Sequence, residues 1–281
     1  MNLYFLFGIP FLGGVEKSLK NSAADLIDKA IGTKQMDKME LLTRFTKGGS
    51  LYSDFWKIIN NALNIVKPFG YALITTYFLM YLFDSAAKDQ VTVDTLIKVL
   101  IQLVIVVAVI KNLDTIINTF LSISDSLIVK FSGHTKGGGG KKAILQGEEI
   151  VKKWSEKDGC FSIFLQAVIF WLFGIIAKVA VHFAAISRAI EVGWRCIFAP
   201  IGVANCFEGG ANSKGIQYIK ALGVATLSGA AIYITASIGF SLTAGILSNG
   251  TDRGTMFLAL AVYFATAGAA IGAGNKLREL I

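Results

Sequence analysis

Long apolar stretches alternate with short polar segments along most of the chain beyond residue 58. The apolar stretches cover about 59–83, 95–121, 160–206, 218–247 and 255–274. A helix needs roughly 20 apolar residues to cross the hydrocarbon core of a bilayer, which is about 30 Å thick. The pattern therefore predicts membrane-crossing helices. The β-branched run from Leu100 to Ile110 belongs to one of them, because the stretch is too long for a buried strand.

The stretch from Cys160 to Cys206 is longer than one perpendicular crossing requires. Its final part must turn, bend or form a second, shorter helix, and Ala199-Pro200-Ile201-Gly202 is where proline permits this. In the first stretch, Lys67 precedes Pro68 and is expected to extend to the near interface. The predicted fold is an all-α, polytopic transmembrane helical bundle with five to six spans.

The N-terminal part is amphipathic rather than uniformly apolar. Residues 3–12 are too few to span a bilayer, so we expect shallow insertion, and the absence of a preceding basic region argues against a removable signal peptide. Apolar positions recur at helical spacing on both sides of Gly32, which predicts two amphipathic helices between Val15 and Lys47. These helices could lie flat in the interface, pack on a partner protein or form an exposed, solvated pair.

Four regions follow from this pattern. Residues 1–58 form an N-terminal interfacial segment, 59–121 the first two transmembrane helices, 122–159 a polar, basic, Gly-rich loop, and 160–281 a C-terminal transmembrane bundle. The loop contains Lys136, Lys141 and Lys142 around a run of glycines and ends in a short helical pattern up to Trp154. The run departs from a phosphate-binding loop, so it is interpreted as a flexible basic surface.

Composition supports a lipid environment. Charged residues make up 16% of the chain, against about a quarter in soluble domains. The net charge is +8, and of the 27 Lys and Arg residues 8 lie in residues 1–58 and 7 in residues 122–159. Basic clusters outside the apolar spans favour an anionic membrane surface over nucleic acid. The positive-inside rule places both regions in the cytoplasm, and the C-terminus is then inside with six crossings and outside with five.

Neither an enzymatic activity nor a cofactor is expected. The sequence contains no nucleophile elbow, no zinc-protease motif and no nucleotide-binding motif. Cys160, Cys196 and Cys206 have neither metal-ligand spacing nor a pairing that the sequence defines, and we interpret them as small apolar fillers.

Ionisable residues within the long third apolar stretch are the first candidates for function, because charges cost several kcal/mol inside a membrane. Lys178 and His182 are four residues apart and share one helical face. Arg188, Glu191 and Arg195 share another face, and Glu191 is spaced to pair with both arginines. The triad faces a hydrated path or an assembly interface, or it is a structural ion pair at a membrane boundary. His182 is either an interior histidine or a proton relay, and no second buried carboxylate supports a pump.

Small residues follow two faces of the last two spans. One face has Ala221, Ala225 and Gly229, and the other has Gly268 and Gly272 in a Gly-x-x-x-Gly motif beside Ala261, Ala265, Ala269 and Ala273. Such faces allow helix backbones to approach closely. They serve packing within one chain or subunit contact in a ring.

One segment resembles a known family. It is Arg188-Ala189-Ile190-Glu191-Val192-Gly193-Trp194-Arg195-Cys196-Ile197-Phe198-Ala199-Pro200-Ile201-Gly202-Val203-Ala204, followed by Gly215-Ile216-Gln217-Tyr218-Ile219-Lys220. An Arg/Glu-bearing helix, an Ala-Pro-Ile turn, a small-residue loop and a Tyr-Ile-Lys entry into the next span are similar to the TrbL-like family of conjugative type IV secretion systems. The likeness covers about 35 residues, and the N-terminus departs by lacking an early full-length span.

The resemblance implies a subunit of a multi-subunit channel or assembly platform in the bacterial cell membrane. Its implied cargo is single-stranded DNA with an attached relaxase, or a protein effector. The implied partners are further copies of the chain, other secretion subunits and the ATPases that supply energy, together with membrane lipids. Lys136, Lys141 and Lys142 would meet those ATPases or the DNA backbone. The alternatives are a small-solute transporter with its substrate near Lys178 and His182, and a pore-forming, holin-like protein.

Overall fold

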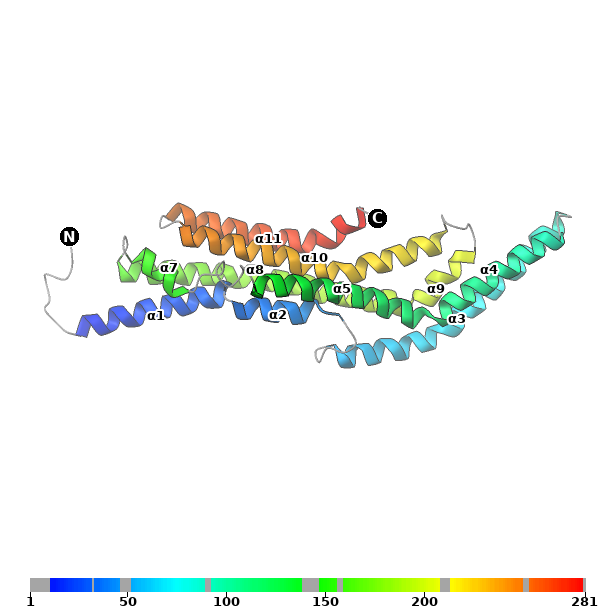
Figure 1. Cartoon of the computed structure of the whole chain (residues 1–281), viewed down its shortest axis with the longest axis horizontal. Coiled ribbons are helices and arrows are strands. Elements are labelled where there is room, and N and C mark those ends of the chain that lie inside the picture. Colours follow the sequence, from blue (N-terminus) through cyan, green and yellow to red (C-terminus); the bar gives the residue numbers. More distant parts are fainter. Residues whose placement is uncertain are drawn as a thin grey trace. The chain divides into compact units, whose positions relative to one another are not determined.

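The computed structural model describes residues 11–31, 33–45, 52–88, 92–137, 147–155, 159–207, 213–249 and 253–279. These residues form helices and short connections, with no strand among them (Figure 1). The helices are α1 (Phe11–Ile31), α2 (Thr33–Thr43), α3 (Ser53–Ala87), α4 (Val93–Lys111), α5 (Leu113–Gly137), α7 (Gly147–Trp154), α8 (Cys160–Ile197), α9 (Ala199–Ala204), the 3-10 helix η2 (Asn205–Phe207), α10 (Lys214–Asn249) and α11 (Arg253–Glu279).

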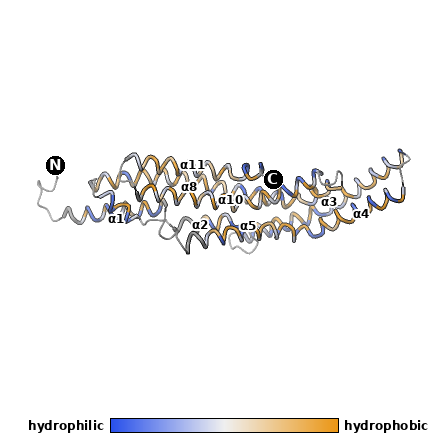
Figure 2. Tube along the Cα trace, turned by 45° about the horizontal axis from the view of Figure 1, so that its top comes forward, coloured by the Kyte–Doolittle hydropathy of each residue, from blue (hydrophilic) through white to orange (hydrophobic). Residues whose placement is uncertain are grey.

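Five helices in the described part of the chain are long and apolar enough to cross a membrane. They are α3, α4, α8, α10 and α11. Figure 2 shows long hydrophobic stretches along α8 and mixed hydrophilic and hydrophobic positions along α1. The predicted all-α, polytopic helical bundle is therefore confirmed, and the protein is a multi-pass membrane protein.

The chain divides into two compact units. The first contains residues 1–40, 130–184 and 233–272, and the second contains residues 41–129, 185–232 and 273–281. The division falls inside α2 and inside the long helices α5, α8, α10 and α11, so each of these helices contributes residues to both units.

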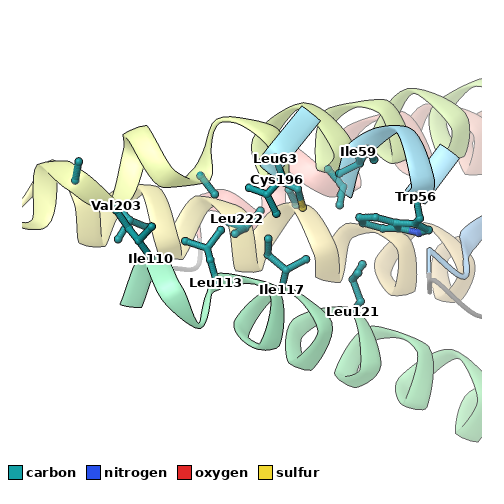
Figure 3. Close-up of a cluster of buried hydrophobic side chains, with 14 of the residues drawn as sticks. Trp56, Ile59, Leu63, Ile110, Leu113, Ile117, Leu121, Cys196, Val203 and Leu222 are labelled. Atoms are coloured by element: carbon teal, nitrogen blue, oxygen red, sulfur yellow. The ribbon is translucent and has the colours of Figure 1, made fainter. Parts of the chain in front are cut away.

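The second unit has an extended apolar core. Ile59 and Leu63 of α3, Ile110 of α4, Leu113 and Ile117 of α5, Cys196 of α8 and Leu222 of α10 are among its buried members (Figure 3). The indole Nε1 of Trp56 donates to the carbonyl oxygen of Phe45 at 2.6 Å, which satisfies the polar atom of the largest core side chain. The tyrosine before α3, Tyr52, donates to the carbonyl of Leu42 at 2.8 Å.

The short helix α9 packs on α3 and α4 in this unit. A Cβ atom at Gly70 of α3 would lie 2.8 Å from both Cβ and the carbonyl oxygen of Pro200, so glycine permits this close approach. Farther along α3, Tyr77 donates to Oδ1 of Asn205 at 2.8 Å. The predicted change of direction at Ala199-Pro200 is confirmed, because α8 ends at Ile197 and α9 begins at Ala199 with proline in its first turn.

In the first unit, the amphipathic helix α1 packs within its own chain. Its buried side chains are those of Ala23, Ala24, Ile27 and Ala30. Helix α7 lies on α1, and Gly147 allows the contact because a Cβ atom there would overlap the carbonyl of Ala24. The backbone N–H of Gly147 donates to Oδ1 of Asp28 at 2.6 Å, so an aspartate from α1 satisfies a free N–H at the start of α7.

Helix α5 differs from the expected arrangement. One membrane-crossing helix is predicted up to Leu121, but α4 ends at Lys111 and a separate helix, α5, begins at Leu113. Helix α5 extends to Gly137 and so includes part of the region interpreted as a loop. Asn112 separates the two helices, with its side chain bonded to the carbonyl of Ala108. In α5 the buried positions are 113, 117, 121, 124, 125, 128 and 132, a helical repeat that includes serines and an aspartate. Polar residues on the buried side conceal this periodicity in the sequence.

The two amphipathic helices predicted between Val15 and Lys47 are present as α1 and α2, and the short helix ending at Trp154 is present as α7. Nζ of Lys67 pairs with Oδ2 of Asp114 at 2.6 Å. The expected extension of Lys67 to the membrane interface stays a prediction. The expected shallow insertion of residues 3–12 falls mainly on residues outside the described ranges.

Candidate functional site

Three charged residues near the end of α8 form two ion pairs. Oε2 of Glu191 accepts from Nη1 of Arg188, and Oε1 accepts from Nε and Nη2 of Arg195 at 3.1 and 2.9 Å. All three side chains are partly buried. The pairing predicted from three- and four-residue spacing is confirmed, while a role of this triad in conduction or assembly stays a prediction.

The triad also holds the end of α11. Nη2 of Arg188 donates to Oδ1 of Asn275 at 3.3 Å, and the guanidinium lies where a Cβ atom at Gly274 would be. Glycine at this position lets the guanidinium pack directly against the backbone of α11. Sequence reasoning missed both residues, because nothing local links positions 87 residues apart.

The segment that carries the family resemblance forms one packed turn. The hydroxyl of Tyr218 on α10 donates to the carbonyl oxygen of Arg195 at 2.5 Å. Its ring covers Gly202 of α9, where a Cβ atom would lie 2.5 Å from Cγ of the ring. The end of α8, the helix α9 and the start of α10 are thus joined through one tyrosine. At the end of this turn, burial raises the pKa of the Cys206 thiol, against a smaller opposite effect of its hydrogen bond with Ser213.

Lys178 and His182 make hydrogen bonds within the first unit. Lys178 is buried and its Nζ donates to the carbonyl oxygen of Lys29, in the last turn of α1. A cation there is favourable because the C-terminal end of a helix carries partial negative charge. Nδ1 of His182 lies 2.7 Å from the carbonyl oxygen of Lys178. This arrangement joins α1 to α8, and nothing in it favours a solute site over a structural role.

The two small-residue faces have different surroundings. On α10, Ala225 is buried, and a Cβ atom at Gly229 would lie 2.6 Å from the carbonyl oxygen of Thr43, so this face packs within the chain. On α11, no described residue comes within 4 Å of a Cβ atom placed at Gly268 or Gly272. Ala261, Ala265 and Ala269 are exposed, whereas Ala273 is buried.

The structure describes little of the three lysines predicted to form a basic surface. The backbone of Lys136 belongs to α5, and Lys141 and Lys142 lie outside the described residues. Among the residues that the structure describes, no group of three or more His, Cys, Asp or Glu side chains could hold a metal ion.

The fold and these contacts define the class of the chain as an all-α, multi-pass membrane protein with a charged triad at the end of its longest helix. Comparisons with protein-family models, curated proteins and solved structures find no match.

Proposed function

We propose that the protein is an integral membrane subunit of a conjugative type IV secretion system in the bacterial cell membrane. It forms or supports an oligomeric translocation channel for a DNA–protein substrate and has no enzymatic activity of its own. Partner ATPases supply the energy, and the basic residues Lys136, Lys141 and Lys142 contact those ATPases or, transiently, single-stranded DNA.

The observation that carries this proposal is the packing of the segment that resembles the TrbL-like family. Residues of its separate parts meet: Arg195 of the charged helix, Gly202 of the small-residue turn and Tyr218 of the entry into the next span. Pro200 of the same turn packs on Gly70 of α3. The resembling residues pack together in the second unit. A resemblance in packed residues supports an architecture shared with the TrbL-like family better than a resemblance in scattered surface residues would.

Oligomerisation is supported by the free small-residue face of α11. Gly268 is exposed, and no described residue lies within 4 Å of a Cβ atom placed at Gly272. Small residues at four-residue spacing favour close helix association in lipid, so this face is suited to a helix that the single chain does not supply. We therefore place a contact between copies of the chain at this face. Replacing both glycines by leucine should reduce the crosslinked oligomer in membranes, and the same yield of oligomer as in the unmodified protein would exclude this face.

The direct test of the function is plasmid transfer from a donor strain. Deletion of the gene should abolish transfer, and the intact gene supplied in trans should restore it. Unchanged transfer after deletion contradicts the proposal. A small-solute transporter would instead move a solute when purified alone, and a holin-like protein would permeabilise cells on expression.

The charged triad is tested by Glu191→Gln, which keeps the shape of the side chain but removes the charge that pairs with both arginines. We expect transfer to fall by about tenfold or more, the change that about 1.4 kcal/mol of assembly free energy produces. Asp54→Asn is the matched control, because Asp54 makes a single exposed pair with Lys57. Equal transfer and oligomerisation in Glu191→Gln and the unmodified protein would exclude a role for the triad.

A further inference from the structure

Helix α1 runs beside the apolar part of α8 in a fixed register. The side chain of Cys160 lies beside that of Glu16, and a Cβ atom at Gly174 would lie 3.4 Å from Cβ of Ala30. The two contacts are 14 residues apart on both helices. At 1.5 Å per residue, α1 and α8 therefore lie side by side and parallel for about 21 Å.

The C-terminal end of α1 is held at this depth by two side chains from the spanning helices. Lys178 of α8 donates to the carbonyl of Lys29, and the hydroxyl of Tyr263 on α11 donates to the carbonyl of Ala30 at 2.6 Å. Carbonyls in the last turn of a helix lack partners within the helix, so both bonds satisfy groups that are otherwise costly to bury.

The outer face of α1 is polar along the same length. Its exposed residues are Lys17, Ser18, Asn21, Ser22, Asp25 and Lys29. Lys29 and Asp25 pair at 2.6 Å with both side chains 60% exposed. A helix with this face would leave several polar groups and charges in hydrocarbon, at several kcal/mol each, if acyl chains covered it.

The outer face of α8 beside it is apolar. Residues 161–177 carry no charged side chain, a length of about 26 Å that is close to the thickness of the hydrocarbon core. Phe161 is 71% exposed, and Leu165, Leu172, Phe173 and Ile176 are exposed as well. Water would not tolerate so large an apolar surface, whereas acyl chains cover it at no cost.

From these two faces at one depth we infer that α1 lines a water-filled path inside the membrane while α8 contacts the acyl chains. The first unit is then a wall with lipid on one side and water on the other. Further copies of the chain supply the remaining walls, since water at this depth must be enclosed. The inference deepens the proposed function, on which it rests for the further copies of the chain and for the nature of the cargo.

Spin labels on the full-length protein in liposomes test this directly. The background carries Cys160→Ser, Cys196→Ala and Cys206→Ser, and single cysteines replace Ser18 or Ser22 on α1 and Leu165 or Leu172 on α8. Collisions with a water-soluble nickel chelate and with oxygen are measured by power saturation. Ala23→Cys is the buried control, because Ala23 is 0% exposed, and its label should meet neither reagent.

We expect the ratio of nickel to oxygen collisions to be about tenfold higher on α1 than on α8, because the chelate is confined to water and oxygen concentrates in hydrocarbon. Oxygen-dominated collisions on α1 would overturn the inference, since lipid would then cover that face. Nickel-dominated collisions on α8 would also overturn it, since that part of the helix would then lie in water. These outcomes are independent of plasmid transfer, so a failure of the inference and a failure of the secretion function are distinguished.

Discussion

At single residues, some close approaches between helices fall at glycines that face bulky side chains. Gly193 of α8 meets Ile59 and Phe55 of α3, where a Cβ atom would lie 2.7 Å from each side chain. The ring of Tyr218 covers Gly202 in the same way. The sequence shows that the chain is rich in glycine, but which glycines are in such contacts depends on partners that lie far away along the chain.

The substitution Gly202→Ala should therefore destabilise the protein. The added methyl group meets an aromatic ring that is also held by its hydroxyl, so we expect a loss of about 1–3 kcal/mol in the free energy of unfolding. Thermal unfolding in detergent measures it. Gly133→Ala in α5 is the matched control, because no described residue lies within 4 Å of a Cβ atom placed there, and alanine in a helix should be neutral or stabilising by up to about 1 kcal/mol. Equal unfolding temperatures for both variants would contradict the packing of Tyr218 on Gly202.

Two buried tyrosines of the first unit form a second matched pair. The hydroxyl of Tyr263 donates to the carbonyl of Ala30, whereas the hydroxyl of Tyr233 has no hydrogen-bond partner among the described residues. Tyr263→Phe should cost about 1–2 kcal/mol of unfolding free energy, because it leaves a carbonyl without its partner. Tyr233→Phe should be neutral or slightly stabilising, since it removes a buried polar group that lacks compensation. Chemical denaturation in detergent compares the two, and a larger loss for Tyr233→Phe would exclude the bond between α11 and α1.

At the level of helices, the local sequence largely determines where a helix forms. It does not determine which other helices that helix packs against. The periodic apolar positions of α1 and the proline at Pro200 predict helices and the break between α8 and α9. Neither indicates that α1 packs on α8, because the contact of Ala30 with Gly174 joins distant parts of the chain. The buried Ser124 and Asp125 made α5 resemble a polar connection, although they lie on its packed side.

The joint between α1 and α7 gives a prediction at this scale. Asp28 accepts the N–H of Gly147 at the start of α7, so Asp28→Ala should loosen that helix by about 1 kcal/mol, as other losses of a capping side chain do. Hydrogen exchange of the α7 amides should accelerate about fivefold. Asp25→Ala is the control, since Asp25 makes an exposed pair with Lys29 on the same helix, and it should leave α7 unchanged. Unchanged exchange in Asp28→Ala would show that Gly147 alone fixes the joint.

For the molecule as a whole, composition is enough to predict the class of protein. The candidate site can be predicted from the sequence only in part. Spacing along one helix is enough to predict the pairs of Glu191 with Arg188 and Arg195. It is not enough to predict that Arg188 also reaches Asn275, or that Lys67 pairs with Asp114, because these contacts depend on how helices are ordered in space. Local charge patterns are therefore a better guide within helices than between them.

The orientation of the chain in the membrane is the remaining prediction at this scale. If the five long apolar helices of the described residues are the crossings, the two ends of the chain lie on opposite sides. The 8 basic residues before residue 58 favour a cytoplasmic N-terminus. Alkaline phosphatase fused after the last residue should then be active outside the cytoplasm, whereas a fusion between α5 and α7 should be inactive there, because 7 basic residues lie in residues 122–159. Green fluorescent protein at the same two positions should give the reverse result. An inactive phosphatase at the C-terminus, with fluorescence there, would require an even number of crossings and would contradict this orientation.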